Sequence, residues 1–126
     1  MSNIFDDELK NKVNTAINNI FGFEIVKEGE VEKVKAPRMN FPEAVRKRID
    51  FFGKYTEDGL SFLGCLRYIM AVEDEEELKK DFEYGAYEDY LPASQEFIEW
   101  RDEIGTHRLR DMEVAVALIY GLGDGL

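Results

Sequence analysis

Few side chains in this sequence could carry covalent or metal chemistry. His107 is the only histidine and Cys65 the only cysteine, whereas a zinc site takes four nitrogen or sulfur ligands. Apolar residues surround Cys65 and no base lies beside it to lower its pKa, so we expect a buried, unreactive thiol. His107 has no identifiable partner, so we expect an exposed bystander. The sequence therefore predicts no catalytic site, no metal and no cofactor.

Acidic side chains are the most informative group, because they are concentrated in one stretch. The net charge is −11, and residues 57–103 hold fifteen acidic against four basic residues. Within residues 73–89, nine acids interleave with Phe82, Tyr84 and Tyr87. At this density, carboxylates can imitate a nucleic-acid backbone and occupy a groove lined by Lys and Arg, while the rings add contact area. The predicted partner-binding residues are Glu73, Asp74, Glu75, Glu76, Glu77, Asp81, Glu83, Glu88 and Asp89.

The same acidic stretch also fits a plainer interpretation, the solvated face of a surface helix. The short basic run Arg46-Lys47-Arg48 could contact phosphate, but we expect it to pair with the protein's own acids. A net charge of −11 disfavours nucleic acid and anionic membranes as direct partners and favours basic protein surfaces.

Hydrophobic residues recur at helical spacing along most of the chain. We expect helices at 3–21, 40–54, 60–72 and 74–90, a short helix after Ser94, and a last helix that begins at Thr106 and ends at Gly121. Asn40, Ser94 and Thr106 are the expected N-terminal caps. Residues 60–72 are apolar on several sides, which predicts the central and most buried helix.

Residues 23–35 change period. Their alternation around Glu28-Gly29 predicts a short β-hairpin, although a frayed helix or an extended linker fits the same residues. The fold class that follows is mainly α, a single-domain bundle of about five or six helices over residues 1–126. Residues 122–126 are expected to form a flexible tail.

The expected core combines the inner faces of these helices. We expect Trp100 to anchor it together with Phe97 and Ile104, and Leu109, Met112, Val116 and Ile119 to form the inner stripe of the last helix. The predicted core residues are Leu9, Val13, Ile17, Val45, Ile49, Leu63, Leu66, Ile69, Trp100, Val116 and Ile119.

The chain shows no basic, apolar leader at its start and no apolar run of about 18 residues. A single cysteine allows no intrachain disulfide. We therefore expect a cytoplasmic protein without a membrane partner.

Residues 34–122 resemble an uncharacterised family of small proteins from phages and prophages of Gram-positive bacteria. The resemblance rests on Val34-Lys35-Ala36-Pro37, on the segment Phe97-Ile98-Glu99-Trp100, and on Ala117-Leu118-Ile119-Tyr120-Gly121. Here the last pair is Tyr-Gly where the family more often has Gly-Tyr. The resemblance implies a phage accessory origin and carries no activity.

Together these observations predict a non-enzymatic binding protein that occupies the basic nucleic-acid-binding surface of a host protein, such as a nuclease. An anti-CRISPR inhibitor is the sharpest form of that hypothesis. The alternative is a structural or assembly adaptor that oligomerises.

Overall fold

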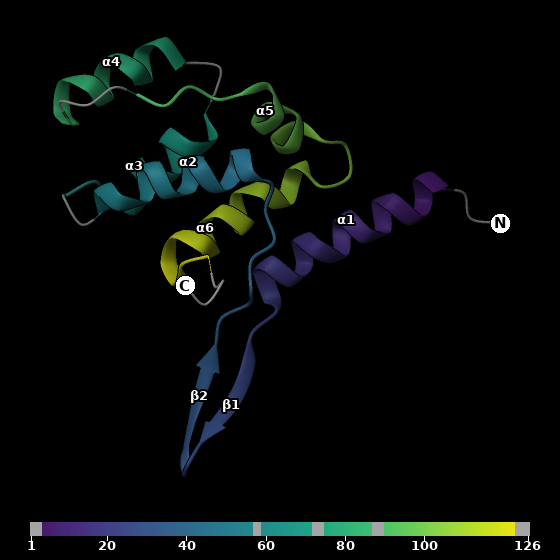
Figure 1. Cartoon of the computed structure of the whole chain (residues 1–126). Helices are drawn as coiled ribbons and strands as arrows, with labels where there is room; N and C mark the ends of the chain where they lie inside the picture. The colour runs from purple at the N-terminus through teal and green to yellow at the C-terminus, as the bar shows by residue number, and fades with distance from the viewer. Residues whose placement is uncertain (1–3, 57–58, 72–74, 87–89, 123–126) are drawn as a thin grey trace. The chain divides into compact units, whose positions relative to one another are not determined.

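The computed structural model describes residues 4–56, 59–71, 75–86 and 90–122, with the backbone alone at residues 4–6, 85 and 86. Within these residues the protein is mainly α, as predicted, with six α-helices, two short 3-10 helices and one β-hairpin (Figure 1). The chain divides into two compact units. Unit 1 comprises the residues up to Phe41 together with those from Glu103 on, and unit 2 comprises Pro42–Asp102. This division does not test the single-domain expectation, which stays a prediction.

Unit 1 consists of α1 (Ile4–Phe21), the hairpin, η2 (His107–Leu109) and α6 (Arg110–Tyr120). Gly22 ends α1, and its N–H donates to the Asn18 carbonyl at 2.8 Å. Gly121 ends α6 as predicted, with a φ of 81° that favours glycine. Leu122, expected in a loose tail, accepts a hydrogen bond from the Met39 N–H at 3.0 Å. The rest of that tail lies outside the described residues.

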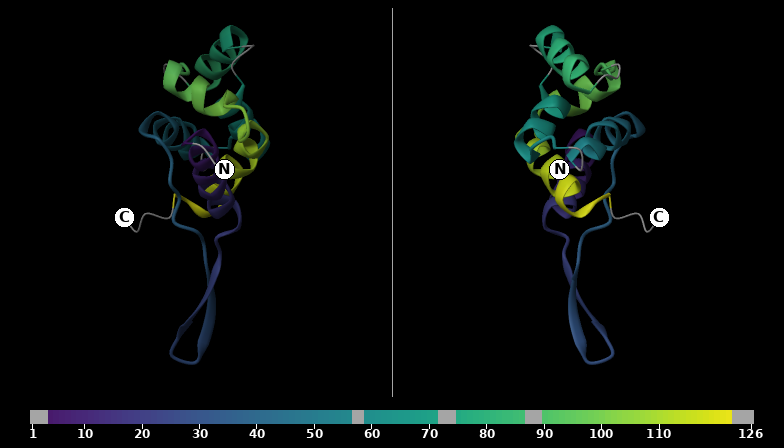
Figure 2. Two further views of the ribbon diagram at one scale, coloured as in Figure 1. Left: turned by 90° about the vertical axis from the view of Figure 1, so that its right-hand side faces the viewer. Right: turned by 90° about the vertical axis from the view of Figure 1, so that its left-hand side faces the viewer.

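The hairpin predicted at 23–35 is confirmed as β1 (Glu24–Glu28) and β2 (Val31–Lys35). The strands pair antiparallel, with Ile25 opposite Val34, and a two-residue loop joins them. Gly29 begins this loop with a φ of 64°, the left-handed conformation that tight hairpin turns require. The hairpin extends away from α1 and α6 in each view (Figures 1 and 2), and nearly all of its side chains are exposed.

Unit 2 contains the remaining helices. They are α2 (Glu43–Gly53), η1 (Lys54–Thr56), α3 (Phe62–Met70), α4 (Glu75–Ala86) and α5 (Gln95–Asp102). Two serines fix helix starts: the Gly64 N–H donates to Ser61 Oγ at 3.0 Å, and the Phe97 N–H donates to Ser94 Oγ at 3.2 Å. The Ser94 cap is therefore confirmed.

Two predicted caps are wrong. Asn40 lies three residues before α2 begins, and its N–H donates to Asn19 Oδ1 at 2.9 Å. Thr106 makes no capping bond, because its hydroxyl donates to the Glu103 carboxylate at 3.3 Å. The partner of the Asn40 N–H lies 21 residues away in the sequence, where the local pattern does not reveal it, whereas the partner of the Thr106 hydroxyl lies three residues before it.

The predicted core is confirmed only in part. Val45, Ile49 and Ile69 are buried, whereas Leu9, Ile17, Leu63 and Ile119 are exposed. The other four, Val13, Leu66, Trp100 and Val116, are half-buried. Ile104, expected beside Trp100 and Phe97, is 87% exposed.

The prediction that residues 60–72 form the central and most buried helix is also wrong. This helix is shorter than predicted, and of its residues only Cys65 and Ile69 are buried, while Leu63 is 72% exposed. The last helix is rotated from its expected phase, so that it buries Arg110, Glu113, Val114 and Ala117 in place of the predicted stripe. The reason is a buried ion pair, described below.

Candidate partner-binding surface

The acidic stretch forms α4, which attaches to unit 2 through an apolar face. Leu78 and Phe82, four residues apart, are 1% and 4% exposed. Glu75, Glu76 and Glu77 occupy the first turn, where the helix dipole favours negative charge. Burial of one face and charge at one end therefore explain why this sequence is helical.

The opposite side of α4 is open to solvent. Glu76, Glu77 and Asp81 are exposed, and Tyr84 is 87% exposed. Glu77, Asp81 and Tyr84 follow each other at spacings of four and three residues, which places them along one ridge of the helix. We name this the α4 ridge. It combines two carboxylates with a large aromatic ring that nothing in the described residues covers.

Glu75 and Glu83, two of the predicted partner-binding residues, each accept a hydrogen bond from a backbone N–H. Glu75 Oε1 accepts the Ala93 N–H at 2.7 Å, and Glu83 Oε2 accepts the Tyr90 N–H at 3.1 Å. Both residues are half-buried. Their carboxylates bind residues 90–93 to α4 and so have a structural role.

The remaining predicted partner-binding residues are Glu73, Asp74, Glu88 and Asp89, which lie outside the described residues, as does Tyr87. Lys79 and Lys80 are exposed on α4 as well. They partly neutralise the helix, and Lys80, three residues after Glu77 and four before Tyr84, lies beside the α4 ridge.

Phe82, expected to supply contact area to a partner, instead forms part of an aromatic cluster. Its ring lies 5.2 Å from Tyr55, 5.3 Å from Phe52 and 5.6 Å from Tyr68, mostly edge to face. Tyr90 joins the same cluster, and burial raises the pKa of its hydroxyl. The cluster holds α4 on unit 2 and leaves the α4 ridge outward.

Arg48 is the most consequential residue that sequence reasoning misplaced. It is 1% exposed, and its partners are backbone carbonyls where the protein's own acids had been expected. Its guanidinium donates to Tyr68 O at 2.6 Å, Ile69 O at 2.9 Å and Leu91 O at 2.6 Å. The first two carbonyls lie at the end of α3, where they have no partner within the helix. Arg101 Nη1 donates to a third carbonyl there, Met70 O, at 2.7 Å.

The basic run is therefore divided, because Lys47 is exposed while Arg48 is part of the interior. The signal for this was helical phase: Arg48 lies three residues after Val45 and four before Phe52, both buried. The Arg48 guanidinium also lies 4.8 Å from the Phe97 ring centroid and 5.2 Å from that of Phe52.

A hollow of about 600 Å³ opens beside α2 and the start of α5. The polar residues that line it include Glu43, Lys47, Ser94 and Glu96, and both carboxylates are exposed to solvent.

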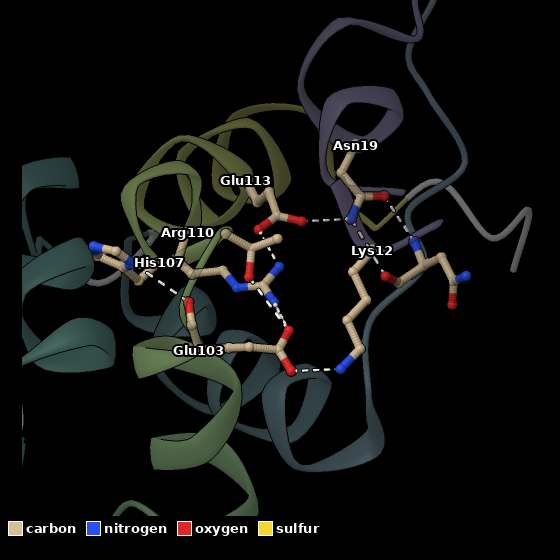
Figure 3. A network of polar contacts seen from close by, with 8 residues as sticks. Lys12, Asn19, Glu103, His107, Arg110 and Glu113 are labelled. Carbon is tan, nitrogen blue, oxygen red and sulfur yellow. Dashed lines mark hydrogen bonds and ion pairs between the residues drawn. The ribbon is translucent and has the colours of Figure 1, made fainter. Parts of the chain in front are cut away.

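Unit 1 contains a buried polar network (Figure 3). Glu113 is 1% exposed and accepts from Arg110 Nη1 at 2.8 Å and from Asn19 Nδ2 at 2.9 Å. Arg110 Nη2 also lies 3.5 Å from Glu103, whose other oxygen accepts from Lys12 Nζ at 2.6 Å. Every carboxylate oxygen in this network has a donor, so its chemistry is structural.

The predictions that Cys65 is buried and that His107 is exposed are confirmed. Cys65 is buried, and burial raises the pKa of its thiol from 9.0 to about 11. His107 is exposed, with Nδ1 3.3 Å from the Glu103 carbonyl. Among the described residues, no three His, Cys, Asp or Glu side chains are grouped so that they could hold a metal ion.

The described helices include none that has both the length and the apolar character to cross a bilayer. No family model, curated protein or solved structure matches the chain. The resemblance to small phage proteins therefore stays a prediction.

Proposed function

We propose that this protein acts by binding, and that the α4 ridge docks on a basic surface of a protein that handles nucleic acid. One observation carries the proposal: Tyr84 is 87% exposed in helical register with the exposed carboxylates of Glu77 and Asp81. An exposed tyrosine contributes little to the stability of unit 2, whereas tyrosine is enriched at the centres of interfaces.

The chemistry of the α4 ridge fits a groove lined by Lys and Arg. Two carboxylates along one side of a rigid helix present charges at a fixed spacing, and the tyrosine ring stacks on guanidinium groups. The acidic residues Glu73, Asp74, Glu88 and Asp89, which are also predicted to bind the partner, flank the helix in sequence and add to the same negative electrostatic field.

The mechanism is competition without a covalent step. While the α4 ridge occupies the basic groove, nucleic acid is excluded from it. A cytoplasmic nuclease is the kind of partner this chemistry suits, and inhibition of an RNA-guided nuclease is the narrowest form of the proposal. Because the attraction is screened over about 10 Å at 0.1 M salt, binding weakens as the salt concentration rises.

The experiment compares proteins captured from a nuclease-treated bacterial lysate by the wild type and by Glu77→Lys/Asp81→Lys. Both substituted side chains are exposed, so the variant keeps its fold. Glu75 is left unchanged, because a lysine there would remove the acceptor of the Ala93 N–H and confuse folding with binding. We expect the variant to lose partners that added duplex DNA also displaces from the wild type.

The matched control is Glu96→Lys/Glu99→Lys, which makes the same change in net charge on exposed positions of α5. It should retain the partners. If it loses them equally, net charge alone governs capture and the α4 ridge has no special role. If Glu77→Lys/Asp81→Lys captures the same proteins as the wild type, the proposal fails.

Tyr84→Ala separates the aromatic contribution from the charge. It leaves every carboxylate in place, and we expect roughly tenfold weaker binding to any partner identified above. Unchanged affinity would assign the interaction to charge alone.

A further inference from the structure

Helix α6 has its polar and apolar residues on unexpected sides. Its buried face carries the charged pair Arg110 and Glu113. Its exposed face carries Met112, Ile119 and Tyr120, which are 44%, 61% and 56% exposed. A surface helix normally has the reverse arrangement, and a helix that is apolar on its outer side is normally covered.

Helix α1 has a matching feature. Leu9, Val13, Ile17 and Phe21 recur every fourth residue and form one stripe along the helix. Val13 is half-buried, whereas Leu9, Ile17 and Phe21 are 41%, 44% and 64% exposed. The apolar stripe therefore continues into solvent instead of ending at the core.

The two apolar surfaces turn to the same side of unit 1. Helices α1 and α6 pack against each other. They run in the same direction, because Asn19 contacts Glu113 near the start of α6, and Phe23, two residues after α1, contacts Tyr120 at the end of α6. Viewed along the helix axis from the N-terminus, the stripe lies about a quarter turn clockwise from the side of α1 that faces α6. Met112 lies about a quarter turn anticlockwise from the side of α6 that faces α1. Because the two helices run in the same direction, both surfaces point to the same side of unit 1. We name the combined surface the α1/α6 face.

The area of the α1/α6 face fits a specific dimer. A large apolar residue exposes on the order of 200 Å² when fully open, so the six exposed residues together present roughly 600 Å² per copy. Two copies would bury about 1,200 Å², the lower end of the range for specific interfaces. The residues are Leu9, Ile17, Phe21, Met112, Ile119 and Tyr120.

Charge indicates which occupant fits. The exposed charged side chains near this face include Asp7, Lys10, Arg108 and Asp111, two acids and two bases, so neither sign is in excess among them. A basic partner would therefore gain little there, and a membrane-binding helix would carry an excess of Lys and Arg for anionic headgroups. A second copy offers the same neutral, apolar surface, and the repulsion expected from a net charge of −11 is not focused on it.

We propose that the α1/α6 face is the interface of a homodimer, in which each copy presents the same residues to the other about a twofold axis. The inference is independent of the α4 ridge. The two also respond oppositely to salt: binding through the α4 ridge weakens, whereas an apolar interface between acidic copies persists or strengthens as repulsion is screened.

The experiment measures the mass of the full chain by light scattering and sedimentation across a concentration series and two salt concentrations. We expect twice 14.6 kDa for the wild type. Ile119→Glu should raise the dissociation constant at least about 100-fold, since it places a charge in an apolar contact. Ile17→Glu tests α1 in the same way.

The matched control is Ile25→Glu on the hairpin, a more exposed isoleucine away from the α1/α6 face. It should leave the dimer intact, and circular dichroism verifies that all variants fold. A wild type that stays monomeric overturns the proposal, as does a dimer that survives both Ile119→Glu and Ile17→Glu. Co-sedimentation of a monomeric wild type with phosphatidylcholine vesicles would assign the face to lipid and also overturn it.

Discussion

The two units each bury an arginine but satisfy it differently. In unit 1, Arg110 pairs with the carboxylates of Glu113 and Glu103. In unit 2, Arg48 donates to backbone carbonyls and lies over aromatic rings. Both guanidiniums are at least 95% buried, so water offers neither of them an alternative partner. The difference lies in the chemical nature of the acceptors.

That difference determines whether a second mutation can restore the stability that is lost with the arginine. A carboxylate partner belongs to a side chain, so a second substitution can remove it and leave no buried charge. A carbonyl belongs to the chain itself and cannot be removed. Unit 1 should therefore tolerate replacement of its whole polar pair, whereas unit 2 should depend on the one arginine.

The largest effect is expected for Arg48→Met. It leaves the buried or part-buried carbonyls of Tyr68, Ile69 and Leu91 without this donor, each costing about 1–3 kcal/mol, so we expect a loss of roughly 5 kcal/mol in unfolding free energy. Arg48→Lys should restore only part of it, because an ammonium group cannot span the acceptors as a planar guanidinium does. Urea titration measures both. A lysine variant as stable as the wild type would contradict the proposed role of the guanidinium geometry.

Arg110→Met should cost slightly less, about 3–5 kcal/mol, because it leaves Glu113 as a buried charge without its counter-ion. The decisive variant is Arg110→Met/Glu113→Leu, which removes the charge as well. We expect it to recover at least about 2 kcal/mol of the loss in the same titration. Equal instability of the single and double variants would erase the contrast between the two units.

Cys65 extends the comparison to a buried group without an ionic partner. Burial raises the pKa of its thiol from 9.0 to about 11, so between these values the unfolded chain loses a proton that the folded protein keeps. The unfolding free energy should therefore fall as the pH rises from 9 to 11, by at most about 3 kcal/mol, and this contribution is fully present below 9.

The control for this pH dependence is Cys65→Ala, measured over the same range. Tyr68 and Tyr90, whose pKa values burial also raises, contribute to both proteins and cancel in the difference. Identical pH profiles for wild type and variant would show that the thiol is solvated.

The smallest effect concerns Tyr55, whose buried hydroxyl has no hydrogen-bond partner among the described residues. Tyr55→Phe removes a polar group that gains nothing from burial, so stability should stay within about 0.5 kcal/mol or rise. Tyr90→Phe is the control, because its hydroxyl accepts from Arg48 Nη2 at 3.5 Å and its loss should be measurable. A larger loss for Tyr55→Phe than for Tyr90→Phe would reverse this expectation.

The sequence predicted those parts of the fold that local chemistry determines. Ser94 and Gly121 mark helix ends through their own hydrogen-bonding and backbone preferences, and Gly29 marks the hairpin turn. The phase of the last helix was not predictable in this way. Residues 114–119 are apolar on every side, so hydrophobic periodicity favours no face, and the contact between Glu113 and Asn19 decides it.

The candidate surface was predicted in composition but not in detail. Nine acids in one stretch are visible in the sequence, yet nothing there separates Glu75, which binds the Ala93 N–H, from its neighbours Glu76 and Glu77. That distinction depends on residues 90–93, which lie beside α4 only after the chain has folded. Long-range hydrogen bonds of this kind do not affect the periodicity of the sequence, so that periodicity does not predict them.

Trp100 gives the protein an intrinsic fluorescent reporter at a known position in the fold. It is the only tryptophan of the chain, it lies in unit 2, and its ring is 5.9 Å from that of the buried Phe97. Its emission therefore reports on its surroundings in α5, while the amide NMR signals of α1 and α6 report on unit 1. Coincident midpoints by the two signals would mean one cooperative folding unit, and separated midpoints would mean two.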